Sequence, residues 1–272
     1  MTFTPNVLLR VQLNWDNVAD NNVLGGATLT PFGLSQNEWA QLKLVDFPNV
    51  NFKGLHIFQW GNILDPLQLA KIWQAIIPQL QQLAKTLDLT LEIIDLGGGL
   101  GIPYAQDDQA LQWNQVQTVL QTLQTICPKT EIWMELGRYA IGTFGCYLAQ
   151  VVDRKSINGH EILVLSGGVN HLLRPGIINQ PLPATRLRKS NAILTTMEVH
   201  GPLCTSLDKL GSFELPNDTE IGDWLLFSQC GAYGFTESMP WFLCHTLPAE
   251  VIFKHNKVEI IRYPEQPESW MK

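Results

Sequence analysis

The spacing of hydrophobic positions along the chain changes near residue 143. Before that point, four short apolar runs each end beside a polar or glycine-rich turn, which is typical of buried strands. These runs cover residues 7–13, 52–58, 89–96 and 131–136. Apolar residues at i, i+3 and i+4 predict amphipathic helices over 69–83 and 116–126, the first of them kinked at Pro78. A weaker helix is predicted over 37–43, after Ser35.

The four predicted strands end on polar side chains at a nearly constant interval. Arg10, His56, Asp95 and Glu135 are separated by 46, 39 and 40 residues. A strand and a crossover helix repeated at such a period are typical of (β/α) barrels, whose chemistry gathers at the C-terminal ends of the strands. A closed barrel of this class has eight units. Residues 1–143 therefore predict a partial (β/α)8 barrel of about four βα units.

After residue 143 the helical period gives way to the alternation that is typical of strands. Candidate strands cover residues 146–154, 161–165, 192–199, 223–228 and 250–263, the last with a turn at His255 and Asn256. Short alternating segments in series predict an antiparallel β-sandwich or β-barrel over 144–272. The expected fold class is thus α/β plus all-β, in two domains.

Composition narrows the functional classes without identifying one. The chain is 45% apolar and 16% charged, with a net charge of −7, which argues against disorder and against a nucleic-acid partner. It has no apolar run long enough for a membrane helix and no secretion signal at its start, so we expect a cytoplasmic protein with no membrane partner. Five cysteines without a C-x-x-C pair fit reduced thiols, and no metal site is expected.

Two glycine-containing turns follow neighbouring predicted strands. Gly97, Gly98 and Gly99 follow Asp95, where exposed backbone N–H groups can approach an anion closely, although a tight structural turn is an equally good interpretation. Glu135 is followed by Gly137 and Arg138, and a local Glu135–Arg138 ion pair is the alternative there. Together the two turns could surround one phosphate and leave Glu135 free to face a ring.

The second predicted domain holds further candidates. Cys204 lies between Gly201-Pro202 and Asp208, which favours a thiol placed on a shaped loop; a small buried hydrophobic residue is the alternative interpretation. Tyr233, in Gly231-Ala-Tyr233, is ambiguous, because a buried tyrosine usually fills space. The histidines at 160, 171, 245 and 255 have no metal-ligand spacing and are interpreted as structural or solvent-facing.

Taken in order, these segments resemble one family, the fold type III pyridoxal-phosphate decarboxylases, which include the diaminopimelate, ornithine and arginine decarboxylases. The resemblance extends over essentially the whole chain. The matching motifs are LLRV, FGL, GLHIF, DLGGGLGIPY, ELGRY, GGVNHLLRP, GPLCTSLD, GAYGF and PAEV. A series of short motifs in the family's order and spacing is far more specific than any one of them.

The resemblance implies roles for these residues in a homodimer whose active sites lie at the interface. Pyridoxal 5′-phosphate would be the cofactor, and Glu135 would pair with its pyridine nitrogen. Cys204 would help to protonate the carbanion, while Arg174, Thr205 and Asp208 would face the substrate. The residues implied to contact the cofactor are Gly97, Gly98, Gly99, Gly137, Arg138, Tyr233, Phe58 and Arg10.

The chain also departs from the family. Thr205 replaces the acidic residue that meets a substrate ammonium in the diamine-handling members, so the resemblance is to the branch that acts on conjugates or carrier-bound intermediates, as in siderophore or antibiotic biosynthesis. In the family's His-x-His-x-Gly-Ser-Gln motif, Phe58 replaces the second histidine and Gly61 replaces the serine.

The first half-barrel and its Schiff-base lysine have no counterpart among these residues. None of the eleven lysines lies in the family's Lys-Ala-Asn-like motif. We therefore expect the C-terminal portion of an amino-acid decarboxylase, completed by a longer chain or by a separate N-terminal half in trans. The alternative is a catalytically inactive relative that binds or regulates a partner; a racemase of the same fold type is a third possibility, disfavoured by GPLC and GAY.

Overall fold

A computed structural model of the protein describes residues 4–13, 30–58, 60–105 and 107–269. Contacts between Cα atoms divide the chain into two compact units. The parallel-sheet unit comprises residues 1–103 and 108–140, and the mixed-sheet unit comprises residues 104–107 and 141–272. The boundary expected between residues 143 and 144 stays a prediction.

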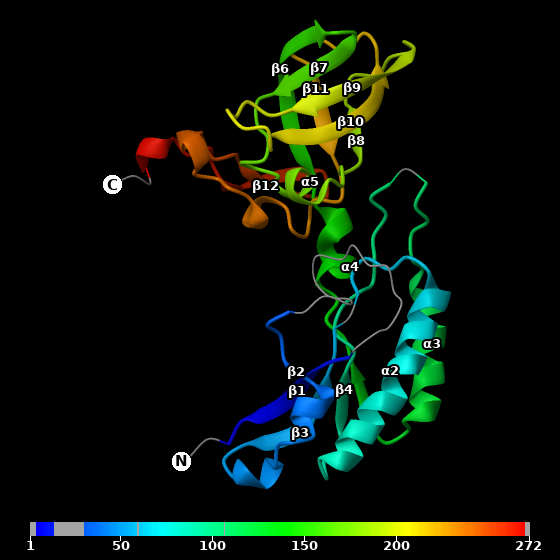
Figure 1. Cartoon of the computed structure of the whole chain (residues 1–272). Helices are drawn as coiled ribbons and strands as arrows, with labels where there is room; N and C mark the ends of the chain where they lie inside the picture. The colour runs from blue at the N-terminus through cyan, green and yellow to red at the C-terminus, as the bar shows by residue number, and fades with distance from the viewer. Residues whose placement is uncertain (1–3, 14–29, 59, 106, 270–272) are drawn as a thin grey trace. The chain divides into compact units, whose positions relative to one another are not determined.

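The parallel-sheet unit is built on five parallel strands in the order β2-β1-β3-β4-β5 (Figure 1). They are β1 (Asn6–Gln12), β2 (Leu34–Ser35), β3 (Asn51–His56), β4 (Ile93–Asp95) and β5 (Glu131–Trp133). All four predicted strands are present, but β4 and β5 are much shorter than their apolar runs. Leu89 and Leu91, for example, pack against the hydrophobic core instead of pairing with a strand.

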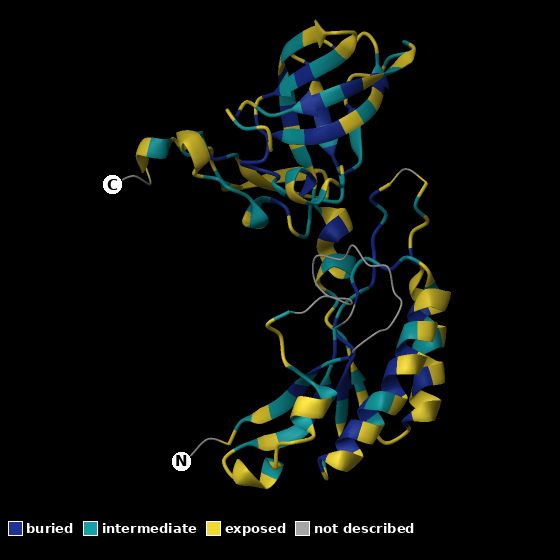
Figure 2. Ribbon diagram, in the orientation of Figure 1, coloured by how far each residue is buried: buried dark blue, intermediate teal, exposed yellow. Residues whose placement is uncertain are grey.

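Two long helices cover this sheet, α2 (Pro66–Thr86) and α3 (Trp113–Ile126), as the periodicity predicts. Asp65 caps α2 by accepting from the Leu67 N–H at 2.9 Å, and Pro66 occupies the first turn. Figure 2 shows buried positions along one side of each helix. The helix α2 continues through Pro78 to its end at Thr86, so the proline does not terminate it.

The predicted helix over 37–43 is shorter in the structure. Helix α1 covers only Gln36–Trp39, although Ser35 and Glu38 form a complete capping box. None of its residues is buried, because four residues cannot form the apolar stripe that holds a longer helix in place. Trp39 anchors it by donating from Nε1 to the Arg10 carbonyl at 2.8 Å.

The mixed-sheet unit contains a six-stranded sheet in the order β10-β9-β7-β6-β11-β8. Its strands are β6 (Tyr147–Ile157), β7 (His160–Leu165), β8 (Ala184–Arg186), β9 (Leu194–His200), β10 (Lys209–Pro216) and β11 (Trp224–Phe227). The end strands β8 and β10 also contact each other, so the sheet is nearly closed.

The expectation of a purely antiparallel domain is wrong for one pair of strands. β7 and β9 are parallel, with Leu163 opposite Val199. A parallel pair requires a long connection, and residues 166–193 supply it, including helix α5 (Arg174–Ile178) and β8. The sequence patterns also missed β8, which has three residues, and β10, which contains Gly211 and ends at Pro216.

The predicted terminal hairpin is confirmed as β12 (Glu250–Lys254) and β13 (Lys257–Arg262). His255 and Asn256 form its turn with φ of 50° and 58°, the pair of positive angles that a two-residue hairpin turn requires. One further short helix is α4 (Gly137–Ile141). Single 3₁₀ turns cover Leu44–Asp46, Gly142–Phe144, Phe235–Glu237, Phe242–Cys244 and Pro267–Ser269.

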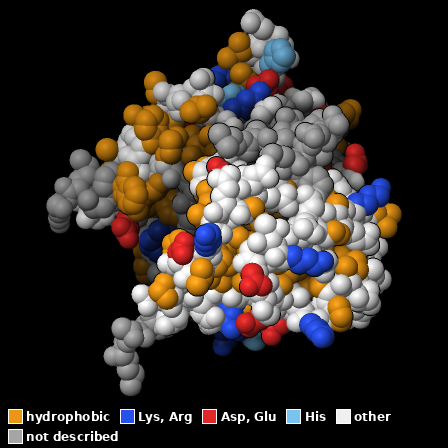
Figure 3. Space-filling view, turned by 60° about the horizontal axis from the view of Figure 1, so that its bottom comes forward, with side chains coloured by type: hydrophobic (Ala, Val, Ile, Leu, Met, Phe, Trp, Pro, Cys, Tyr) orange, Lys and Arg blue, Asp and Glu red, His pale blue; other side chains and the backbone are white. Residues whose placement is uncertain are grey.

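The surface agrees with the low charge of the sequence. On the face in Figure 3, acidic and basic side chains are interspersed among polar and apolar ones.

Every helix in the described part of the chain is too short or too polar to cross a membrane. All five cysteines are free thiols, and only Cys127 is buried.

Candidate functional site

Strand register aligns the polar strand ends of the parallel-sheet unit. Arg10 on β1 is opposite His56 on β3, and His56 is opposite Asp95 on β4. Asp95 is in turn opposite Trp133 on β5, two residues before Glu135. Because all these strands are parallel, their C-terminal ends share one edge of the sheet, as the 40-residue period predicts.

The glycine turn after β4 is shaped by its close packing against neighbouring segments. Gly97 and Gly99 have φ of +67° and +111°, and a Cβ at Gly97 would lie 2.8 Å from the Ile57 carbonyl oxygen. The buried Asp95 carboxylate accepts from the Gly97 N–H at 2.8 Å, so Asp95 holds the start of the turn. At the other side, the Glu135 N–H donates to the Gly97 carbonyl at 2.8 Å.

This turn also fits an anion such as a phosphate. In the described part of the chain, no protein oxygen accepts a hydrogen bond from the N–H groups of Gly98 or Gly99. A Cβ added at Gly137 would meet no other atom within 4 Å, so the second predicted phosphate loop is open. Backbone N–H groups without an internal acceptor are what phosphate binding by a glycine-rich turn requires.

His56, Asp95 and Glu135 form a cluster next to the turn. One potential ligand atom from each lies within 4.8 Å of the other two, so a cation could bind there. His56 Nε2 lies 3.8 Å from Glu135 Oε2 and, within the described residues, has no hydrogen-bond partner. The Glu135 side chain is 59% exposed, which leaves its carboxylate accessible to a ring nitrogen.

The other predicted cofactor contacts in this unit have different surroundings. The Phe58 ring lies against the glycine turn, with its Cε2 3.5 Å from a Cβ position at Gly98. The Arg10 guanidinium stacks over Phe32, at 4.6 Å from the ring centroid. Arg138 lies half-buried in α4. Gln59, in the same motif as Phe58, lies outside the described residues.

In the mixed-sheet unit, the segment 167–176 contacts both 201–208 and 230–238. These three segments are here named the loop cluster. Asp208 joins the first two, since its Oδ1 accepts from the Val169 N–H at 2.7 Å and its Oδ2 from the Leu203 N–H at 2.6 Å. The Leu173 N–H donates to Ser238 Oγ at 3.1 Å, which joins the first and third.

The substrate contact that the resemblance implies for Asp208 stays a prediction; the structure shows its carboxylate bound within the protein. Its side chain is 1% exposed, and each carboxylate oxygen is already bound to a backbone donor. Its position suits a residue that shapes the Cys204 loop. Gly168 and Gly201 leave the space for its carboxylate, because a Cβ at either position would overlap it.

Cys204 and Thr205 lie on the outer part of this loop. The Cys204 side chain is exposed, which suits a thiol that exchanges a proton with a small molecule. The half-buried Thr205 hydroxyl accepts from the Leu207 N–H at 3.3 Å and so closes a turn of the loop.

The structure brings Arg174 and Tyr233 together, and it adds a residue that the sequence patterns missed. The Arg174 guanidinium carbon lies 4.6 Å from the centroid of the Tyr233 ring. Glu237 accepts two hydrogen bonds from Arg174 Nη1, both of 2.9 Å. Glu237 lies two residues after the Gly-Ala-Tyr-Gly-Phe segment, and nothing in that spacing signals a partner 63 residues away.

His171 is structural in this unit, one of the two roles predicted for it. Tyr147 Oη and His171 Nδ1 are 2.9 Å apart, and His171 Nε2 is 3.2 Å from the Thr246 carbonyl. Burial lowers the pKa of His171 and raises that of Tyr147. A neutral His171 that accepts from Tyr147 and donates from Nε2 satisfies both contacts.

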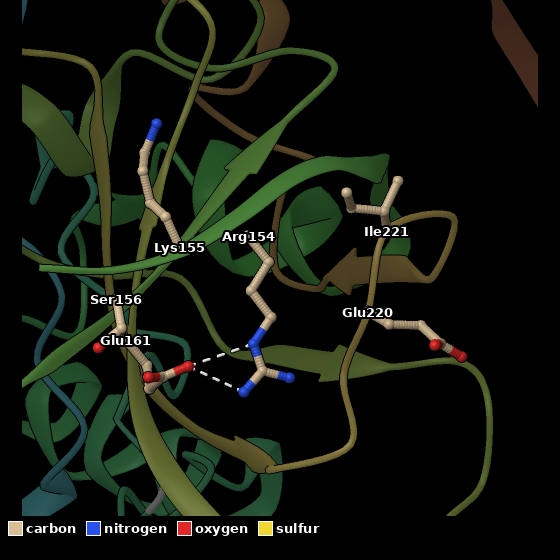
Figure 4. A pocket seen from close by; sticks show the side chains of 6 residues that line it. All are labelled: Arg154, Lys155, Ser156, Glu161, Glu220 and Ile221. Carbon is tan, nitrogen blue, oxygen red and sulfur yellow. Dashed lines mark hydrogen bonds and ion pairs between the residues drawn. The ribbon is translucent and has the colours of Figure 1, made fainter.

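A separate surface hollow lies beside β6 and β7 (Figure 4). Its Arg154 donates to Glu161 at 3.2 and 2.8 Å, and also to the carbonyls of Asn217 and Thr219. These contacts tie the strands to the turn before β11, so the guanidinium has a structural role. The lining residues are Arg154, Lys155, Ser156, Glu161, Glu220 and Ile221.

Comparison with known proteins identifies the family of the chain. Residues 18–231 match the family described as pyridoxal-dependent decarboxylase, C-terminal sheet domain. The L-glutamyl-BtrI acyl-carrier protein decarboxylase of Niallia circulans is 27% identical over 78% of this chain and 52% of its own length. Protein TabA of Pseudomonas amygdali pv. tabaci is 31% identical over 80% of this chain and 52% of its own.

The fold of the chain is similar to that of solved decarboxylase structures. A diaminopimelate decarboxylase from M. jannaschii superposes with a TM-score of 0.82 at 24% identity, over 96% of this chain and 62% of that one. The chain thus spans about half the length of the first curated relatives that it matches. Since the family match covers most of the chain, the protein belongs to the pyridoxal-dependent decarboxylase family.

Proposed function

We propose that this chain is the C-terminal portion of a pyridoxal-phosphate-dependent amino-acid decarboxylase. The observation that carries the proposal is the row of Arg10, His56 and Asp95 beside the glycine turn, in a member of this family. In this proposal the parallel sheet is half of a (β/α)8 barrel. Its remaining βα units and the Schiff-base lysine come from a longer chain or from a separate N-terminal half in trans.

The parallel-sheet unit would hold the cofactor. The N–H groups of Gly98 and Gly99 would donate to its phosphate, with Gly137 and Arg138 on the open side. The exposed Glu135 carboxylate would keep a proton on the ring nitrogen, and Phe58 would cover one face of the ring. The chemistry that the cofactor supplies when bound is an electron sink for the electron pair left by departing carbon dioxide.

The mixed-sheet unit would supply residues on the substrate side. Cys204 Sγ would donate a proton to the reacting carbon, and its exposure on the loop cluster makes it accessible. Tyr233 would contact the cofactor from this unit. We further propose a homodimer with active sites at the interface, acting in the cytoplasm.

For the substrate, we propose an amino-acid unit within a conjugate or a carrier-bound intermediate. Thr205 offers no charge to a distal ammonium group, which disfavours a free diamino acid. The Niallia circulans relative is described as acting on an L-glutamyl carrier protein, which supports this class. The diaminopimelate decarboxylases among the relatives make the free diamino acid the competing substrate.

Carbon dioxide release tests the proposal. The chain is mixed with a polypeptide that supplies the missing βα units, with pyridoxal phosphate, and with either an L-glutamyl carrier protein or diaminopimelate. We expect release only from the mixture and mainly from the glutamyl carrier. Cys204→Ala should lower the rate by about 100-fold, whereas Cys146→Ala, at another exposed cysteine, should not change it. A correctly assembled mixture with no release would favour an inactive, regulatory family member.

A further inference from the structure

The loop cluster contains very few charged residues. Within residues 167–176, 201–208 and 230–238, all of which the structure describes, the Asp, Glu, Lys and Arg residues are Arg174, Asp208 and Glu237. Asp208 is buried and accepts from two backbone N–H groups. What a substrate meets here therefore depends on how Arg174 and Glu237 are arranged.

Arg174 is bound internally. Its side chain is 6% exposed, and both oxygens of the Glu237 carboxylate lie 2.9 Å from its Nη1. The Tyr233 ring stacks against the guanidinium at 4.6 Å. Among the described residues Glu237 is the counter-ion of Arg174, whose buried Nε has no hydrogen-bond partner there. A buried arginine that loses its counter-ion is strongly unfavourable, because its charge cannot be solvated. The Glu237 carboxylate thus lies at Arg174 Nη1, a position where the carboxylate of a ligand would bind.

Lys209, which directly follows the segment 201–208, is also paired with a carboxylate. Its Nζ lies 2.9 Å from Glu198 Oε2. Arg262, whose guanidinium carbon lies 4.5 Å from the Phe235 ring centroid, has Nη2 3.9 Å from Glu250 Oε2. An additional carboxylate would therefore meet cations whose charges are already compensated by neighbouring carboxylates.

We infer that Glu237 is a specificity-determining residue: by occupying Arg174, it selects a substrate whose distal end is uncharged. This inference rests on the proposed decarboxylase function and deepens it. A carboxyl group joined to a carrier through a thioester, or to a conjugate through an amide, has no charge to offer Arg174. A free distal carboxylate would meet the Glu237 carboxylate and be repelled. A distal ammonium would find no unpaired anion in the loop cluster as described.

The alternative is that Arg174 receives a substrate carboxylate and Glu237 moves away. The Glu237 side chain is 32% exposed, so it has room to move. The two possibilities differ in what Glu237 does to anion affinity. If a ligand carboxylate readily displaces Glu237, Arg174 already binds carboxylates in the unmodified protein. If it selects against them, its removal creates that affinity.

The experiment measures the affinity of glutarate, a dianion, and of the neutral glutaramide by NMR titration of the full chain. Glu237→Gln keeps the shape and removes the charge. We expect it to raise glutarate affinity by about tenfold, since a free guanidinium binds carboxylates strongly, and to leave glutaramide affinity unchanged. In the double variant Arg174→Met, Glu237→Gln, the gain should disappear.

A second comparison sets the double variant against the wild type. Arg174→Met, Glu237→Gln should bind glutarate no more weakly than the wild type, because in the wild type the Glu237 carboxylate already compensates the charge of Arg174; a clear reduction would overturn the inference. So would an unchanged glutarate affinity in Glu237→Gln. Neither titration requires the cofactor or turnover, so a failure of the carbon dioxide assay is distinguishable from a failure here.

Discussion

The two units differ in how completely their sheets are covered. In the mixed-sheet unit the end strands approach each other, and β8, at one end, has only three residues. The parallel sheet is open, and β5 at its edge exposes Trp133 by 48%. Parallel sheets are normally covered on both faces. The open parallel sheet, which holds the glycine turn, fits the proposal that further βα units complete it.

The largest effect should come from Asp208, which joins two loops of the mixed-sheet unit. Asp208→Ala leaves the buried N–H groups of Val169 and Leu203 without acceptors, and we expect it to lower the free energy of unfolding by about 3–5 kcal/mol. Urea unfolding measures the loss. Asp153→Asn, at an exposed aspartate of the same unit, should change it by less than about 0.5 kcal/mol. Equal effects of the two would contradict the role of Asp208.

A matched pair of leucines on α2 tests whether the units unfold separately. Leu80 is fully buried and Leu67 is 69% exposed. Leu80→Ala should cost about 2–5 kcal/mol, and Leu67→Ala less than about 0.5 kcal/mol. Amide hydrogen exchange should show the loss of protection in the parallel-sheet unit only. Equal losses in β6 and β7 would show one cooperative body instead.

A smaller effect is expected from His171, and it depends on pH. Burial lowers the folded-state pKa of His171 below 6.5, so the unfolded chain takes up a proton first as the pH falls. The unfolding free energy of the mixed-sheet unit should therefore be constant above about pH 7 and decrease below 6.5, by at most about 1.4 kcal/mol per pH unit. His171→Gln should remove this part of the slope. An identical slope in wild type and variant would disprove the assignment.

The smallest effect is predicted for Cys204. Its side chain is exposed and no structural hydrogen bond of its thiol occurs in the described chain, so Cys204→Ser should change the free energy of unfolding by less than about 0.5 kcal/mol. The same thiol should react with iodoacetamide much faster than buried Cys127, which peptide mass mapping can measure. A large loss of stability would mean that this loop is structural.

Local patterns in the sequence were sufficient for much of the fold. The period of polar strand ends identified the parallel strands, and His255-Asn256 identified the hairpin, because both features depend on residues close in sequence. The parallel pairing of β7 with β9 was not predictable, since it depends on where a connection of nearly thirty residues returns to the sheet.

In the candidate site too, the features within short motifs were predictable and the contacts between distant segments were not. The glycine turn and Glu135 are visible from short motifs, whereas the partner of Arg174 lies 63 residues along the chain. The burial of Asp208 was equally hidden, because a carboxylate bound by backbone N–H groups has no sequence signature. What the sequence misses here are the contacts between loops.

Borohydride trapping tests whether the catalytic lysine lies on this chain or on the polypeptide that supplies the missing βα units. The chain is incubated with pyridoxal phosphate, alone and with the polypeptide that supplies the missing βα units, then reduced, and the intact mass of each polypeptide is measured. We predict a stoichiometric pyridoxyl adduct on a lysine of the complementary polypeptide and none on these 272 residues. A stoichiometric adduct on this chain alone would contradict the proposal that the catalytic lysine lies elsewhere.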